Sequence, residues 1–155
     1  MTSHSNAVQM LLDDHQRVKQ LFNEFQSAND PNRQQQIAQQ VMQELEVHTA
    51  IEEEIFYPAM REQGDAEDKE LVAEAFEEHA GAKELIAQLR TMKAADPQFA
   101  GIFKQLQQDV AHHVQEEETE MLPKAEEELK NQLDSLGEKM MSRKQTLMST
   151  MQSAR

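Results

Sequence analysis

The stretch EVHTAIEEEIFYP spans residues 46–58, and the stretch AHHVQEEETEMLP spans residues 111–123. In each stretch a histidine lies four residues before a glutamate. A second glutamate follows the first directly, and a proline lies six residues after the first. Two side chains four residues apart on an α-helix differ in direction by only about 40°. The spacing therefore predicts that His48 and Glu52 share one helix face, and that His113 and Glu117 share another.

Other landmarks recur at almost the same separation. His79 follows His15 by 64 residues, and the break at Asp96-Pro97 follows the break at Asp30-Pro31 by 66. A repeat at a fixed period indicates a supersecondary unit used more than once. We read it as one helical hairpin that occurs twice. Two hairpins that each have one apolar face can bury those faces only by packing together, which predicts a four-helix bundle with approximate two-fold symmetry.

Apolar residues at helical spacing mark four long segments separated by three short breaks. The first is expected over about residues 5–28, the second ends before Pro58, the third follows a turn at Gly64, and the fourth ends at Pro123. Leucines and methionines continue at helical spacing after that proline. The predicted fold class is all-α, an up-down-up-down four-helix bundle with an additional C-terminal helical tail.

The predicted domain organisation follows from these segments. We expect residues 1–125 to form the bundle, and residues 126–155 to form a helical extension that packs on the bundle or on a partner. The length of 155 residues suits a single compact unit. The chain itself gives no preference between a monomer and a homodimer.

Composition narrows the function classes. The formal net charge of −14 disfavours nucleic acid and anionic membranes as partners, and there is no cysteine to form disulfides or thiolate metal sites. The N-terminal stretch MTSHSNAVQM lacks a basic start followed by an apolar run, so we expect a cytoplasmic protein. Any bound metal must use nitrogen and oxygen ligands.

Each of the four helices is predicted to send one histidine inward: His15, His48, His79 and His113. His15, for example, lies four residues after Leu11 and three before Val18, where core side chains point. A single inward histidine is more often a core residue with a hydrogen-bond partner. Four of them at matched positions, two with a glutamate on the same face, favour a metal site instead.

Buried glutamates strengthen this interpretation. Glu52 and Glu117 fall in apolar stripes, where two opposed carboxylates are costly unless a positive charge lies between them. A pair of metal ions would supply that charge. Nitrogen and carboxylate ligands suit iron, manganese or zinc, and carboxylates that can bridge two ions favour a dinuclear iron or manganese centre over zinc.

Neighbouring residues receive simpler interpretations. His112 is read as pointing away from the pocket. A mostly solvated face is expected for Glu53, Glu54, Glu116, Glu118 and Glu120. Tyr57 is read as a redox or hydrogen-bonding neighbour of the site or, in the favoured reading, as a packing residue at a helix end. A ferritin-like di-iron site would need Glu-x-x-His on each of two helices. Leucine and valine occupy the required positions 45 and 110, so that alternative is disfavoured.

The set His15, His48-x-x-x-Glu52, His79 and His113-x-x-x-Glu117 resembles the hemerythrin family, especially its bacterial HHE-type members. The acidic-then-proline flanks are similar too, and the likeness covers about residues 8–125. The resemblance implies that His15 and His48 bind one iron ion and that His79 and His113 bind the other. It also implies that Glu52 and Glu117 bridge the two ions, with an oxo or hydroxo bridge.

The chain departs from the oxygen-carrying hemerythrins at one position. Those proteins have a further histidine four residues from the one on the third helix, where this chain has Ala75 or, in the other direction, Lys83. The resemblance then implies a more symmetric and more open site. We expect it to react with dioxygen, peroxide or nitric oxide in stress handling, and whether it is an enzyme stays open.

The residues are compatible with two other functions. The first is reversible oxygen binding, sensing or iron holding without turnover. The second is a metal-free helical interaction module, which the paired core glutamates disfavour.

Overall fold

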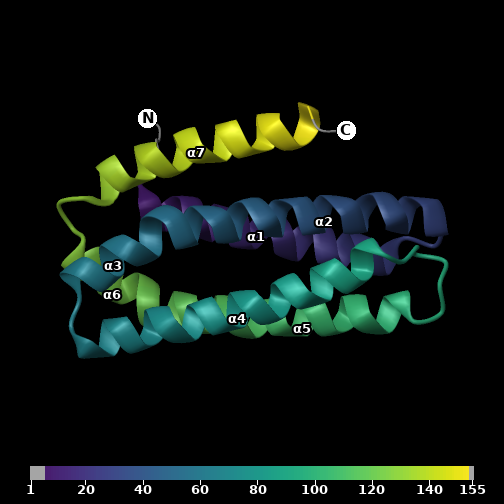
Figure 1. Ribbon diagram of the computed structural model, residues 1–155, viewed down its shortest axis with the longest axis horizontal. Coiled ribbons are helices and arrows are strands. Elements are labelled where there is room, and N and C mark those ends of the chain that lie inside the picture. Colours follow the sequence, from purple (N-terminus) through teal and green to yellow (C-terminus); the bar gives the residue numbers. More distant parts are fainter. Residues whose placement is uncertain (1–5, 154–155) are drawn as a thin grey trace.

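The computed structural model describes residues 6–153. In chain order its elements are α1 (Ala7–Ser27), α2 (Pro31–Ile51), the π-helical turn η1 (Glu52–Phe56), α3 (Tyr57–Gln63), α4 (Ala66–Arg90), α5 (Phe99–Glu116), the π-helical turn η2 (Glu117–Met121), α6 (Leu122–Glu128) and α7 (Leu133–Ser153). The helix α1 packs along α2, and α4 packs along α5, so the two hairpins lie side by side (Figure 1). The predicted all-α bundle with an additional C-terminal helix is confirmed.

Local chemistry accounts for where the helices begin. The Asp30 side chain accepts a hydrogen bond from the Asn32 N–H and Pro31 occupies the first turn, where its missing N–H costs nothing. Asp65 and Asp68 form a reciprocal capping box at the start of α4. Asp96 behaves differently from its repeat counterpart, because it accepts from the Lys93 N–H within the turn and α5 begins only at Phe99.

The second and fourth helices do not end at their prolines, contrary to the sequence-based expectation. Each continues through its proline by way of a π-helical turn, so that residues 31–63 and 99–128 form two long helices. In η1 the Tyr57 N–H bonds to the Glu52 carbonyl five residues back, and in η2 the Leu122 N–H bonds to that of Glu117. A proline ring clashes with the carbonyl four residues before it, and the wider turn relieves that clash.

The apolar core is divided into two clusters. One cluster lies where α1 begins and α3, α6 and α7 meet, and includes Leu11, Phe56, Met60, Leu129 and Met140. The other fills the opposite half of the bundle, and includes Phe22, Val41, Leu89, Phe99 and Leu106. A layer of buried histidines and carboxylates lies between them, since His15 on α1 falls between a leucine of the first cluster and a valine of the second.

The C-terminal helix α7 lies across α1 and α2 (Figure 1). It contributes Leu136 and Met140 to the first apolar cluster, with exposed fractions of 7% and 0%. A division of the chain after residue 125 stays a prediction. No helix within residues 6–153 is long and apolar enough to cross a membrane.

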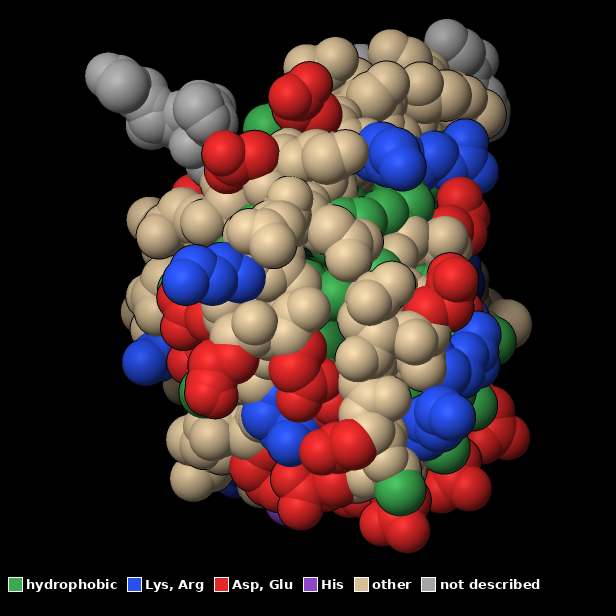
Figure 2. All heavy atoms as spheres, turned by 90° about the vertical axis from the view of Figure 1, so that its left-hand side faces the viewer, with side chains coloured by type: hydrophobic (Ala, Val, Ile, Leu, Met, Phe, Trp, Pro, Cys, Tyr) green, Lys and Arg blue, Asp and Glu red, His purple; other side chains and the backbone are tan. Residues whose placement is uncertain are grey.

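The end of the bundle that carries the α3–α4 turn is strongly charged (Figure 2). There Lys124 on α6 forms ion pairs with Asp65, Glu67, Asp68 and Glu128. These contacts join α6 to the α3–α4 turn and to the start of α4.

Candidate metal centre

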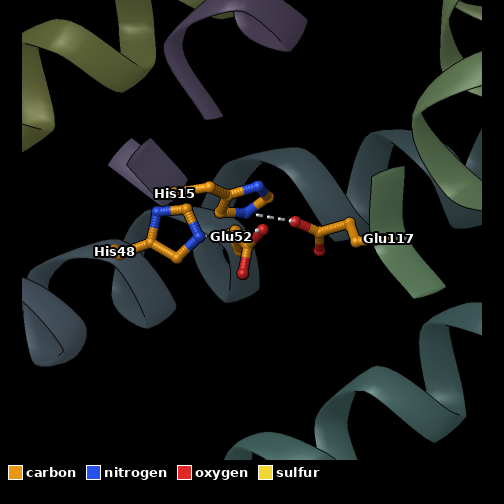
Figure 3. Close-up of side chains that lie close together, drawn as sticks. All are labelled: His15, His48, Glu52 and Glu117. Atoms are coloured by element: carbon orange, nitrogen blue, oxygen red, sulfur yellow. Dashed lines mark ion pairs between the residues drawn. The ribbon is translucent and has the colours of Figure 1, made fainter. Parts of the chain in front are cut away.

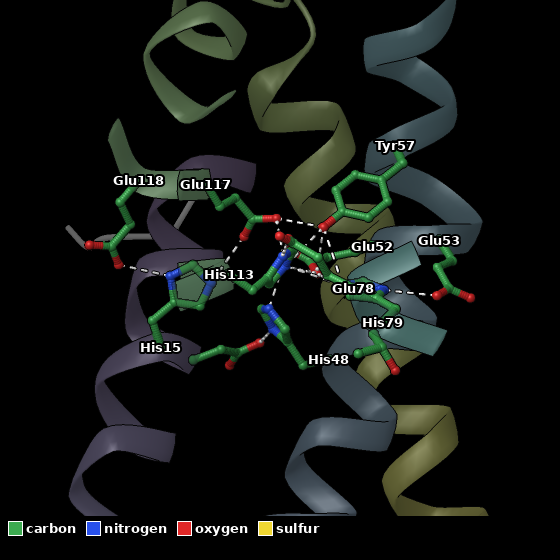
Figure 4. Close-up of polar contacts among 12 residues, drawn as sticks. His15, His48, Glu52, Glu53, Tyr57, Glu78, His79, His113, Glu117 and Glu118 are labelled. Carbon is green, nitrogen blue, oxygen red and sulfur yellow. Dashed lines mark hydrogen bonds and ion pairs between the residues drawn. The ribbon is translucent and has the colours of Figure 1, made fainter. Parts of the chain in front are cut away.

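All six predicted site residues meet in the layer between the two apolar clusters (Figure 4). His15, His48, Glu52 and Glu117 each offer one ligand atom, and these four atoms lie within 4.8 Å of one another (Figure 3). Glu52, His79 and His113 form a second such group. The two groups share Glu52, so the structure places the six residues as two adjoining half-sites.

Each carboxylate touches a histidine in both halves. Glu52 lies 3.3 Å from Nε2 of His48 and 3.0 Å from Nε2 of His79. Glu117 lies 3.0 Å from Nε2 of His15 and 3.5 Å from Nε2 of His113. A carboxylate with one oxygen directed to each half is in the position that a bridging ligand requires.

The unsatisfied atoms of this layer fit a bound cation. Nε2 of His15 and of His48, Oε2 of Glu52 and Oε1 of Glu117 are buried and have no hydrogen-bond partner among the described residues. They lie within ion-pair distance of opposite atoms, but not in a hydrogen-bonding direction. Buried polar groups are nearly always partnered, so four such atoms facing one another need an explanation. A nitrogen and carboxylate donor set suits iron, manganese or zinc.

The Nδ1 atom of each of the four site histidines is held by a carboxylate. We call these carboxylates, Asp14, Glu53, Glu78 and Glu118, the outer ring. The Nδ1 atoms lie 2.7–2.9 Å from a carboxylate oxygen, in the pairs His15 with Glu118, His48 with Asp14, His79 with Glu53, and His113 with Glu78. Because a carboxylate accepts, each Nδ1 must donate. This fixes the ring orientation and directs every Nε2 at the centre, as outer partners of metal-binding histidines commonly do.

The residues of the outer ring occupy matching positions in the two copies of the internal repeat. Asp14 precedes His15 as Glu78 precedes His79, and each holds the other histidine of its own hairpin. The carboxylate that follows Glu52 or Glu117 instead reaches across the bundle. Such contacts make each half-site depend on both hairpins.

One sequence-based interpretation is corrected here. Glu53 and Glu118 are not simply solvated, since their partly exposed carboxylates hold His79 and His15 at 2.8 Å. The available signal was their position, directly after Glu52 and Glu117 in both copies of the repeat. His112 does point outward, with a side chain that is 67% exposed.

Tyr57 lies inside the site, which overturns its reading as a helix-end packing residue. Its hydroxyl lies 2.6 Å from Glu117 Oε2, 3.0 Å from Glu52 Oε1, and 3.3 Å from Nε2 of both His79 and His113. In an α-helix, residues five apart point about 140° away from each other. The π-helical turn η1 removes this difference, so Tyr57 and Glu52 face the same side.

The electrostatics of the layer are those of tightly packed opposite charges. Burial and the charges of Glu52 and Glu117 raise the pKa of Tyr57 well above its usual range, so the phenol stays protonated and can donate. Burial lowers the pKa of His48, but the charge of Glu52 and the hydrogen bond to Asp14 outweigh it and raise that pKa to about 10. Burial likewise opposes charge on His113, whose carboxylate partners Glu117, Glu52 and Glu78 raise its pKa to about 12. Without metal, the protonated imidazoles of His48 and His113 therefore offset part of the carboxylate charge.

Two spaces adjoin the centre. A cavity of about 40 Å³ lies among all four histidines and is lined mainly by apolar side chains, including Val18, Leu45, Ile86 and Val110. A wider groove of about 340 Å³ runs over α1 and α5 and reaches His15. The first has room for a ligand of only a few atoms.

A four-helix bundle with histidines and carboxylates converging from facing helices defines a class of metal-binding bundle proteins. The family comparison is specific within that class: residues 6–125 match the model of the Hemerythrin HHE cation binding domain. The chain belongs to this family.

Two curated proteins are similar in sequence to this chain. A protein of Nostoc sp. named DNA nickase is 34% identical over 107 residues, which are 68% of this chain and 29% of that protein. A hemerythrin-like protein of Schizosaccharomyces pombe is 29% identical over 129 residues, 83% of this chain and 62% of that protein. The chain thus spans less than two thirds of either relative.

A solved structure supports the fold. The crystal structure of an HHE cation binding domain-containing protein from Mycobacterium kansasii has a TM-score of 0.81 and 24% sequence identity, and covers 95% of this chain and 90% of that one. The similarity extends past residue 125, so it includes the C-terminal helix as well as the bundle.

Proposed function

We propose that this protein binds two iron ions, one held by His15 and His48 and the other by His79 and His113, with Glu52 and Glu117 bridging them. The observation that carries the proposal is that each of the two carboxylates touches a histidine in both half-sites. Four buried ligand atoms without hydrogen-bond partners support it. Manganese and zinc are the alternatives that metal analysis distinguishes.

We further propose that the protein reacts with a small oxidant, namely dioxygen, peroxide or nitric oxide, in stress handling. Two ferrous ions would supply two electrons to such a ligand. The protein's residues prepare the site for it: the outer carboxylates aim the four Nε2 atoms, and the Tyr57 hydroxyl holds a proton beside Glu52 and Glu117. The small cavity among the four histidines has room for a ligand of a few atoms.

Reversible binding, sensing or iron holding without turnover is the second candidate. The observation in its favour is the small size and mainly apolar surface of the cavity, which suits holding a diatomic ligand. Both candidates use the same six residues, so they differ in outcome and not in site. Cytoplasmic location and the choice between a monomer and a homodimer stay predictions.

Metal analysis tests the binding step. Protein reconstituted with ferrous iron under nitrogen is expected to hold about two iron ions per chain after gel filtration. The histidine pair on α5 supplies a matched control: His113→Ala should lose metal, whereas His112→Ala, one residue away and 67% exposed, should keep it. Absence of bound metal in the unaltered protein, or equal losses in the two variants, would contradict the proposal.

Reaction is tested by stopped-flow absorption of the iron-loaded, reduced protein mixed separately with dioxygen, peroxide and nitric oxide. Consumption of peroxide or nitric oxide over several turnovers supports the reactive function. A long-lived oxygen adduct that is released under vacuum, without turnover of the other two, supports reversible binding instead.

A further inference from the structure

The C-terminal helix reaches the buried polar layer through one lysine. Lys144 on α7 places its Nζ 2.8 Å from Oδ1 of Asp14. The other oxygen of that carboxylate, Oδ2, lies 2.9 Å from Nδ1 of His48. Asp14 is 7% exposed, so its contact with His48 is buried, and its contact with Lys144 is partly buried. The chain Lys144, Asp14, His48 therefore connects α7 directly to a half-site.

This contact breaks the symmetry of the outer ring. The repeat counterpart of Asp14 is Glu78. Where Asp14 has Lys144 beside it, Glu78 has His112 and Glu116 of α5. A lysine also contacts Glu53, but Lys83 belongs to α4, within the bundle. Among the described residues, only Asp14 receives its cation from outside residues 6–125, the part that matches the family.

We propose that Lys144 is a positioning residue for the His15 and His48 half-site. It acts through Asp14 and makes α7 a functional part of the metal centre. This inference rests on the proposed metal binding. Lys144 holds Oδ1 and thereby fixes the plane of the carboxylate, so that Oδ2 stays directed at Nδ1 of His48. The imidazole is then held with Nε2 toward the centre.

Lys144 could affect metal affinity in two opposite ways, by charge repulsion and by positioning Asp14. The larger of the two effects decides whether the lysine weakens or strengthens binding. Its positive charge repels a bound cation, which would weaken binding. The lysine side chain is 27% exposed, however, so water and salt screen that charge over the distance to the site. Loss of the outer partner of a metal-binding histidine, here Asp14, typically costs 10- to 100-fold in affinity. Lys144 acts through that partner, so its removal is expected to weaken binding by an amount at the lower end of this range.

Three variants separate positioning from general effects. Lys144→Met keeps the length of the side chain and its packing but removes the ammonium group. Lys144→Arg keeps a cation that can still reach the carboxylate. Arg143→Gln is the matched control, because Arg143 is the preceding residue and pairs with Glu54, away from the centre.

Cobalt(II) is a suitable probe, since the metal-free chain can be titrated against a competing chelator and followed by visible absorption. We expect Lys144→Met to weaken one of the two sites about 10-fold and to leave the other unchanged. The arginine variant should stay within about threefold of the unaltered protein, and Arg143→Gln should match it. Far-ultraviolet circular dichroism must show equal helix content in all four proteins.

A double-mutant cycle tests whether Lys144 acts through Asp14. Asp14→Asn should weaken the same site, and addition of Lys144→Met to it should cost nothing more. Unchanged or tighter binding in Lys144→Met, equal weakening of both sites, or additive losses in the double variant would overturn the inference. If the unaltered protein binds no cobalt and no iron, the proposed function itself fails.

Discussion

The Tyr57 hydroxyl donates to Oε2 of Glu117 at 2.6 Å, across 60 residues of sequence and from one hairpin to the other. The hydroxyl oxygen of Tyr57 also lies 3.0 Å from Oε1 of Glu52. One phenol therefore lies between both predicted bridging carboxylates. In the repeat, the counterpart of Tyr57 is Leu122, which is apolar and buried, so this polar contact exists in only one half of the site.

Tyr57→Phe isolates the hydroxyl, because the ring keeps its edge contact with Phe76. A buried carboxylate that loses a hydrogen-bond donor should lower the free energy of unfolding of the metal-free protein by about 2 kcal/mol. Urea denaturation measures the change. The iron-loaded protein should lose less, since the cations then neutralise both carboxylates. Equal stability of the two metal-free proteins would show that the hydrogen bond contributes nothing.

Outer carboxylates that cross between the hairpins should control metal affinity. We expect Glu53→Gln and Glu118→Gln each to weaken metal binding by about 10- to 100-fold, because an amide is a poorer acceptor for the histidine Nδ1 proton. Glu54→Gln is the control, since the Glu54 carboxylate is 46% exposed and accepts hydrogen bonds from Arg143 on α7. Chelator competition with cobalt(II) gives the affinities. A loss in Glu54→Gln as large as in the other two would point to overall charge and not to the contacts.

Metal uptake should release protons and strengthen with rising pH. The pKa of His48 is raised to about 10 and that of His113 to about 12, so both imidazoles are protonated at pH 7 without metal. A bound cation needs the neutral ring and displaces those protons. About two protons from these residues should appear per loaded chain, measured by calorimetry in buffers of different ionisation enthalpy. Metal affinity that falls as pH rises from 6 to 8 would contradict the assignment.

The stability of the metal-free protein should fall at both high and low pH. The histidines contribute less stability as pH rises, and Glu52 contributes less as pH falls. A raised histidine pKa stabilises the folded state below the unfolded value of about 6.5, and this contribution is lost as pH rises toward 10. The pKa of Glu52 is lowered, because the charge of His48 and hydrogen bonds from the histidines outweigh burial. Its contribution is present above about pH 4.5 and lost as pH falls. Melting temperatures from pH 3 to 10 should therefore peak between these limits.

The repeat and the spacing of four residues were sufficient to predict the bundle and the convergence of the six residues. They succeed because α-helical periodicity places His48 with Glu52, and His113 with Glu117, on one face. That periodicity fails where the helix is not an α-helix. A π-helical turn is not visible in a pattern of 3.6 residues, so the pattern favours a packing role for Tyr57 and a helix end at Pro58.

Two features depend on packing between elements distant in sequence. Glu53 and Glu118 resemble the exposed glutamates beside them until the opposite hairpin brings a histidine to each. Lys144 lies in a tail whose sequence predicts a helix but not where that helix docks. The contact with Asp14, 130 residues earlier in the chain, becomes visible only once α7 is placed on α1 and α2.

Each long helix could continue through its proline in either of two hydrogen-bond registers, α-helical or π-helical. The prolines favour the π-helical register that the structure shows. In an ordinary α-helical register the Tyr57 N–H would bond one residue later than Glu52, and every side chain beyond would rotate by about 100°. Pro58 disfavours this competitor, because its ring would collide with the carbonyl of Glu54. Pro123 does the same in the second hairpin. A residue with no polar side chain thus selects which chemical groups the helix presents to the interior.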